Sequence, residues 1–394
     1  MKNHKVRNSL LALTGLVALT IYVLACGTAF SPDDAKVLYP AFDKENGQVG
    51  LAVYDRKARV SQMLFVPASI EDGERISPNP RILRGHWLPD GRTILAAWPG
   101  IKDNDDDGLS LAVLPVEGRG TFRLYQLPNV DEAAAWFTMP LPLVGNRVFI
   151  RLESNQVARL DLKTGTLVTA AVPGLEKDGM LYPSPRGDTV FCVLQEEDSD
   201  GPAVFARLDP NTFKTTPILT ITNEVADSGF FAFNNTGRRF AIVEEIDGAL
   251  QLNVLEGDRT VFSRPLGNEQ GIRFGNALFS PGNDAILASF QRRESEVEGA
   301  SYGIMEIPLD QRPIRETVLV PACSADEEED AMMFQVSLSH DGETAAAAST
   351  YLACEDEAFK AENCALFLVD LKDPKRKVTR VPIPLPPNRK SAVR

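Results

Sequence analysis

The stretch WLPDGRTILAAW, residues 87–98, decides the fold, because it places a tight turn between two apolar strands. Proline presets the backbone angle φ of a turn and glycine tolerates the positive φ that closes it. LPDG therefore ends one strand, and TILAAW begins the next. The phrase recurs as FSPDDAKVLY (30–39), YPSPRGDTVFCVL (182–194), FNNTGRRFAIV (233–243), FSPGNDAILASF (279–290), LSHDGETAAAAS (338–349) and a fainter PLVGNRVFIRL (142–152).

The spacing of these copies predicts the architecture. Aligned on the glycine position of the turn, the copies fall 42 to 59 residues apart, at Asp34, Gly91, Gly145, Gly187, Gly237, Asn283 and Gly342. A second hairpin follows several of them, as in VARLDLKTGTLVTAAV (157–172) and LFLVDLKDPKRKVTRV (366–381), so each unit is expected to form four antiparallel strands. Seven such units without long amphipathic helices predict an all-β fold, a β-propeller of seven blades; the weaker copies leave six or eight blades open.

The turn phrase also indicates a family. Ser-Pro-Asp-Gly followed by an Ile/Leu-Ala-Phe-like strand resembles the TolB-type, WD40-like propeller repeat over nearly the whole chain beyond its first residues. We expect the propeller to span 31–383 and a basic C-terminal tail to span 384–394. Because little chain precedes Phe30, the first blade is expected to have three strands or to borrow its innermost strand, for which RVPIPLPP (380–387) is the candidate.

The first residues predict export. MKNHKVRN (1–8) is basic, and the apolar run of residues 9–23 is shorter than the roughly 20 residues of a membrane-spanning helix, so a signal peptide over 1–25 is favoured over a span. Val23-Leu24-Ala25-Cys26 resembles the bacterial lipobox, which implies that Cys26 is lipidated and that 26–30 form a short tether; an ordinary free cysteine is the alternative. Lipidation implies a cell-envelope location, on the periplasmic side of an outer membrane or on the outer cell surface.

The charge of the chain limits its partners. The formal net charge is −13, which repels nucleic acid and anionic lipid headgroups. We therefore expect no nucleic-acid partner, membrane contact through the lipid anchor only, and a protein, a peptide or an envelope polymer as partner. The basic residues from 375 to 394 are expected to form a solvated end.

The remaining cysteines suit an oxidising compartment. Cys354 and Cys364 flank the acidic segment EDEAFKAEN and are the candidate disulfide, with Cys323 as the rival partner for either. Cys192 lies inside the apolar run TVFCVL, where we expect a buried, unreactive thiol.

Few residues suggest catalysis. His86 and His340 sit in turn phrases, where a structural role is the better interpretation, and a G-x-S-x-G serine motif is absent from the sequence. Asp103, Asp105 and Asp107, followed by Gly108, resemble the start of a calcium loop, although Leu114 stands where an EF-hand has its glutamate. A solvated acidic loop tip is the alternative. The aromatic residues on or beside strands are expected to fill the space between blades: Trp87, Trp98, Trp136, Phe231 and Phe279.

Three functions remain open from the sequence, one of which is a degenerate structural module whose partner is another subunit. The leading hypothesis is a non-enzymatic binding or interaction scaffold at the cell envelope without a cofactor, which the TolB resemblance implies. The alternative is a propeller-type small-ligand binder or metal-dependent enzyme, lactonase- or lyase-like, with carboxylates or calcium at the mouth of the channel. Carboxylates from several blades that converge on the channel would favour this alternative.

Overall fold

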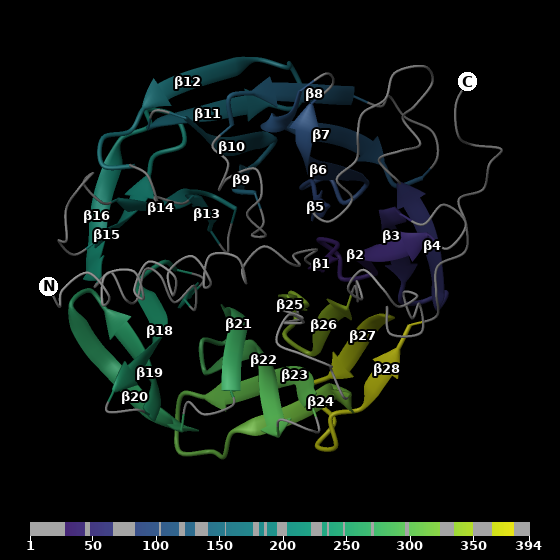
Figure 1. Cartoon of the computed structure of the whole chain (residues 1–394), viewed down its shortest axis with the longest axis vertical. Coiled ribbons are helices and arrows are strands. Elements are labelled where there is room, and N and C mark those ends of the chain that lie inside the picture. Colours follow the sequence, from purple (N-terminus) through teal and green to yellow (C-terminus); the bar gives the residue numbers. More distant parts are fainter. Residues whose placement is uncertain are drawn as a thin grey trace, which may run out of the picture.

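The chain folds into seven four-stranded antiparallel sheets arranged around a centre (Figure 1). This confirms the predicted all-β propeller of seven blades. The structure, a computed structural model, describes residues 28–43, 48–65, 83–101, 104–117, 123–130, 141–153, 155–175, 181–184, 187–194, 203–221, 231–234, 236–246, 249–268, 272–295, 299–323, 335–349 and 365–381. No helix among them has the length and apolar character needed to cross a membrane.

Each blade takes four consecutive strands, from the innermost to the outermost. Blades 1 to 3 contain β1 (Ala29–Phe30), β2 (Lys36–Asp43), β3 (Gln48–Asp55), β4 (Val60–Phe65), β5 (Arg84–Trp87), β6 (Thr93–Ile101), β7 (Asn104–Pro115), β8 (Arg123–Pro128), β9 (Leu143–Val144), β10 (Arg147–Leu152), β11 (Gln156–Asp161) and β12 (Leu167–Ala171). Blades 4 and 5 contain β13 (Leu181–Pro183), β14 (Val190–Leu194), β15 (Ala203–Leu208), β16 (Thr215–Ile221), β17 (Phe231–Phe233), β18 (Arg239–Ile246), β19 (Ala249–Glu256) and β20 (Arg259–Asn268). Blades 6 and 7 contain β21 (Ile272–Phe279), β22 (Ala285–Ser295), β23 (Gly299–Pro308), β24 (Arg315–Cys323), β25 (Gln335–Leu338), β26 (Thr344–Ser349), β27 (Ala365–Asp370) and β28 (Val378–Arg380).

The recurring phrase forms the turn between the first and second strands of every blade. All seven aligned positions have a positive φ, between 55° and 74°, which explains why they are glycine, asparagine or aspartate. Six of these turns close with a backbone hydrogen bond of 2.8–3.0 Å to the carbonyl three residues earlier. Blade 3 differs, since Val144 pairs directly with Arg147 across a two-residue turn, and this shorter turn explains its fainter copy of the phrase.

The hydrophobic core lies between the blades. Seven clusters of buried side chains each join two neighbouring blades and together complete the ring. Trp87 and Trp98 pack between blades 1 and 2, and Phe279 packs between blades 5 and 6, as expected for core aromatic residues. Trp136 lies outside the described residues, and the side chain of Phe231 is not described.

Blade 1 corrects one expectation. Its innermost strand is its own β1, in which Ala29 pairs with Leu38 and Phe30 with Val37. The blade therefore has four strands, where we expected three strands or a borrowed one. A strand of two residues suffices because its neighbours supply contacts: the Trp87 indole N–H donates to the Ala29 carbonyl at 2.9 Å. Propeller structure thus includes Ala29 and Phe30, which the sequence placed in the tether.

Blades 1 and 7 meet without exchanging a strand (Figure 1). One cluster of buried residues joins the two blades, and polar contacts add to it. The Asp34 carboxylate accepts from the backbone N–H of His340 at 3.0 Å and lies 2.8 Å from the His340 Nδ1 atom. The Thr28 and Ser337 hydroxyls are 2.7 Å apart. Asp34 and His340, which belong to the turn phrases of blades 1 and 7, thus help to hold these two blades together, and His340 has the structural role expected for it.

Candidate interaction groove between blades 6 and 7

The predicted calcium site is only partly described. Asp103 lies outside the described residues, while the backbone of Asp105 and Asp107 belongs to strand β7 and their side chains are not described. In the part of the chain that the structure describes, no group of three His, Cys, Asp or Glu side chains could hold a metal ion. The calcium site stays a prediction.

The predicted cysteine chemistry is likewise described at one residue. Cys192 is a free, fully buried cysteine, and burial raises the pKa of its thiol to about 12, which confirms the expected unreactive thiol. Cys26, Cys354 and Cys364 lie outside the described residues, and the side chain of Cys323 at the end of β24 is not described. Lipidation and the disulfide stay predictions.

The inner wall of the ring carries no acids in its described strands. None of the seven innermost strands contains aspartate or glutamate. The histidine there is His86 of β5, whose Nε2 accepts a hydrogen bond of 3.1 Å from the backbone N–H of Leu141. Enclosure by protein, together with the charge of Arg84, lowers the pKa of His86 to about 3, so its imidazole is neutral at physiological pH. The convergent carboxylates that an enzyme-like channel requires are not found on these strands.

Arginine side chains donate hydrogen bonds from one blade to backbone carbonyls of the next blade, and the sequence did not predict these contacts. The guanidinium of Arg159 on β11 donates to the Pro210 carbonyl of blade 4 at 2.9 Å. Arg123 on β8 makes the same kind of contact with the Leu162 carbonyl of blade 3, at 3.2 Å. These side chains satisfy turn carbonyls at the ends of the outer hairpins and keep neighbouring blades in register.

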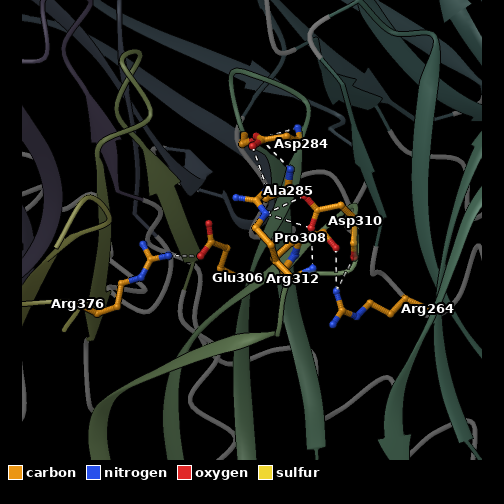
Figure 2. A network of polar contacts seen from close by, with 9 residues as sticks. Arg264, Asp284, Ala285, Glu306, Pro308, Asp310, Arg312 and Arg376 are labelled. Carbon is orange, nitrogen blue, oxygen red and sulfur yellow. Dashed lines mark hydrogen bonds and ion pairs between the residues drawn. The ribbon is translucent and has the colours of Figure 1, made fainter. Parts of the chain in front are cut away.

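A network of polar contacts extends over blades 5, 6 and 7 (Figure 2). Arg264 of blade 5 donates to the carbonyls of Pro308 and Asp310, at 3.1 and 3.2 Å. Arg312 bridges the Asp310 and Asp284 carboxylates, at 2.8 and 3.2 Å, within blade 6. At the other end, Arg376 of blade 7 pairs with Glu306 of β23. The outer hairpins of the three blades are thus held in fixed positions.

A groove of about 510 Å³ opens beside this network, between the outer strands of blades 6 and 7. Residues 315–318 of β24 form one wall, and residues 374–376 and 378 of blade 7 form the other. Its size falls within the range of about 300–1,000 Å³ that is typical of ligand-binding clefts. The wall on blade 7 belongs to the basic run that begins at Lys375. Lys375, Lys377 and Arg380 are exposed, as expected of a solvated segment, whereas Arg376 is buried. Val378–Arg380 pair with β27 in the hairpin that the sequence predicted over 366–381.

Arg376 is the buried part of this groove. Its side chain is 8% exposed, and besides the pair with Glu306 its Nη1 donates to the Leu371 carbonyl at 2.8 Å. Burial lowers the pKa of Arg376, the Glu306 carboxylate acts against that shift, and the nearby charge of Arg315 adds to it. Its φ is 50°, a left-handed conformation that non-glycine residues seldom adopt. These contacts fix the blade 7 hairpin against blade 6.

Comparisons with known proteins show the fold and nothing finer. No family model and no curated protein matches the chain. Among solved structures, KlAtg21 in complex with the coiled coil of AgAtg16 is 13% identical, with a TM-score of 0.54 over 91% of this chain and 98% of that one. Hydrazine synthase of Kuenenia stuttgartiensis is 10% identical, with a TM-score of 0.50 over 76% and 80%. TolB from Acinetobacter baumannii is 12% identical, with a TM-score of 0.42 over 72% and 65%. These likenesses show the fold alone: the chain is a seven-bladed β-propeller.

Proposed function

We propose that the chain is a lipoprotein that acts as a non-enzymatic binding scaffold at the cell envelope. The observation that carries this proposal is the groove between blades 6 and 7, a preformed basic surface on a chain whose formal net charge is −13. Its walls come from two blades that the Arg376–Glu306 pair holds together, so a partner would meet a rigid surface. The described inner strands, which lack carboxylates, support binding over catalysis.

The location rests on the sequence. The lipobox-like Val23-Leu24-Ala25-Cys26 supplies an acceptor for acyl chains, and strand β1 begins at Ala29, three residues later. Several acyl chains on one residue anchor a protein firmly. The ring would therefore lie close to the membrane, on the periplasmic side of an outer membrane or on the outer cell surface. A partner would be a protein, a peptide or an envelope polymer within reach of that membrane.

The test of this proposal is performed in bacteria that express the full chain. Metabolic labelling with an alkyne fatty acid should label the wild type and not Cys26→Ser, and the label should follow the membrane fraction. Crosslinking in intact cells, followed by mass spectrometry, should recover a specific partner. An unlabelled, soluble chain would refute the anchor. Turnover of a small molecule by the purified protein would refute the scaffold in favour of the enzyme alternative.

A further inference from the structure

We propose that the groove between blades 6 and 7 binds an extended acidic peptide segment that carries aliphatic side chains beside its carboxylates. This inference rests on the proposed scaffold function, and it names the class of partner. It depends on three properties of the groove: cations without anionic partners, exposed apolar side chains on both walls, and open strand edges.

The groove is lined by cationic side chains, two of which have no ion pair with a described residue. Glu316 in the wall of the groove is already paired, because the two terminal guanidinium nitrogens of Arg292 each donate to one of its carboxylate oxygens at 2.6 Å. Arg376 is paired with Glu306. Within the described part of the chain, Arg315 and Lys375 have no ion pair, and both are exposed on opposite walls. An acidic ligand would supply the missing anions, and charge complementarity of this kind favours one partner over others.

Apolar side chains line the same groove as these cations. Val318 on β24 is 48% exposed and Val378 on β28 is 37% exposed, and both line the groove. The other exposed large hydrophobic residues in the described ranges lie on other blades and outside this groove: Val60, Leu167, Val168, Ile246 and Val261. Two valines on facing walls are suited to an aliphatic side chain, and a purely anionic sugar polymer would leave them uncovered.

The strand edges complete the site. β24 and β28 are the last strands of their sheets, so each has one edge that pairs with no described strand. An extended peptide that lies along such an edge forms main-chain hydrogen bonds, while its alternate side chains face the groove. The walls are fixed before binding, since Arg376 holds the hairpin of blade 7 and Arg292 holds Glu316. Binding then requires little rearrangement of the protein.

The experiment measures fluorescence anisotropy of labelled peptides with the full chain in detergent. The probes are an alternating Glu-Val peptide and matched Gln-Val and Lys-Val peptides. We expect the Glu-Val peptide to bind best and to weaken with salt. Arg315→Glu with Lys375→Glu should weaken it about tenfold, the effect of a few exposed ion pairs. The matched control is Lys57→Glu with Arg59→Glu, on the exposed hairpin of blade 1, which should bind as the wild type does.

A second pair of variants tests the apolar walls. Val318→Asp should abolish most of the remaining binding, whereas Val261→Asp on the outer strand of blade 5, where the valine is 39% exposed, should not change it. Equal binding by the Gln-Val peptide, or equal weakening in the blade 1 control, would overturn the inference. So would selective binding of an acidic polysaccharide in place of the peptide. If a crosslinked cellular partner survives Arg315→Glu with Lys375→Glu, the peptide site is refuted while the scaffold function stands.

Discussion

Replacement of Gly303 by alanine should destabilise the propeller by about 3 kcal/mol, because the backbone of the next strand occupies the space of the new methyl group. Gly303 lies on β23 opposite Val318 of β24. A Cβ atom at this position would lie 2.3 Å from the Thr317 carbonyl oxygen and 2.8–2.9 Å from two atoms of the Phe290 ring. Real Cβ atoms essentially never approach others below 3.0 Å, so β24 or the ring must shift.

The magnitude follows from what must move. Phe290 is 2% exposed and lies in the core between blades 5 and 6, so its ring has little room. β24 already has an irregular register here, since Tyr302 pairs with Val320 and Gly303 with Val318. Overpacking of a close-packed core costs about 1–3 kcal/mol, and we expect the upper end because a backbone atom is involved. At about 2.1 cal/mol/K per residue over roughly 350 residues, 3 kcal/mol lowers the melting temperature by about 4 °C.

The assay is thermal unfolding followed by circular dichroism, with Gly282→Ala as the matched control. Gly282 lies in the turn before β22, and the closest atom to a Cβ there is the Asp284 side-chain oxygen at 3.2 Å, which can move. The control should change the melting temperature by about 1 °C or less. If Gly303→Ala melts with the control, β24 is not packed against β23 as described. The shape of the groove would then need revision as well, because Val318 faces Gly303.

Three further outcomes are expected. Arg376→Met should lower the free energy of unfolding, measured in urea, by about 2 kcal/mol, because Glu306 is left half-buried without its partner. The control Arg380→Met, on the exposed strand β28, should leave the free energy of unfolding almost unchanged. Equal losses in the two variants would contradict the buried pair. The pKa of His86 is about 3 in the fold and about 6.5 when unfolded, so the unfolded chain binds the extra proton and stability falls as the pH drops below 6.5, by up to about 2 kcal/mol at pH 5. His86→Gln can still accept from Leu141 and should flatten this slope in urea titrations at pH 7 and 5; an unchanged slope assigns the acid sensitivity to another group. The Ser280 hydroxyl and then Arg312 lower the pKa of Asp284, so its contribution is present above about pH 4 and lost as the pH falls through the lowered value. The melting temperature of Asp284→Asn should therefore fall less between pH 5 and pH 3 than that of the wild type. An equal fall in both proteins would show that the fold does not stabilise this carboxylate.

The ring could be predicted because its turns depend on local chemistry. Each of the seven aligned positions needs a positive φ, which glycine, asparagine or aspartate at that one position indicates, and the structure has a positive φ at all seven. Strand β1 was missed since two residues carry no periodicity, and its existence depends on Trp87 and on pairing with β2. Local patterns do not specify which distant side chains will become neighbours.

The groove could not be predicted for the same reason. Its walls come from segments about sixty residues apart, and the adjacent sequence around Lys375 resembles an ordinary basic end. The exposure of Val318 and the pairing of Glu316 with Arg292 become visible only when blades 6 and 7 stand side by side. The lack of histidine-based catalytic motifs could be seen from the sequence, since it depends on residue types alone.

The contact between blades 1 and 7 has a consequence for the order of folding during synthesis. Ala346 and Leu366 pack against Val37 and Tyr39, so the buried seam joins residues from opposite ends of the chain. Domains emerge from the ribosome with the N-terminal part first, and blades 2 to 6 can each stack on a finished neighbour as they appear. Blade 1 must wait for the last blade with Val37 and Tyr39 uncovered. A ribosome that stalls before residue 365 would therefore release an open arc with two apolar ends, and such a product is a natural substrate for chaperones and proteases.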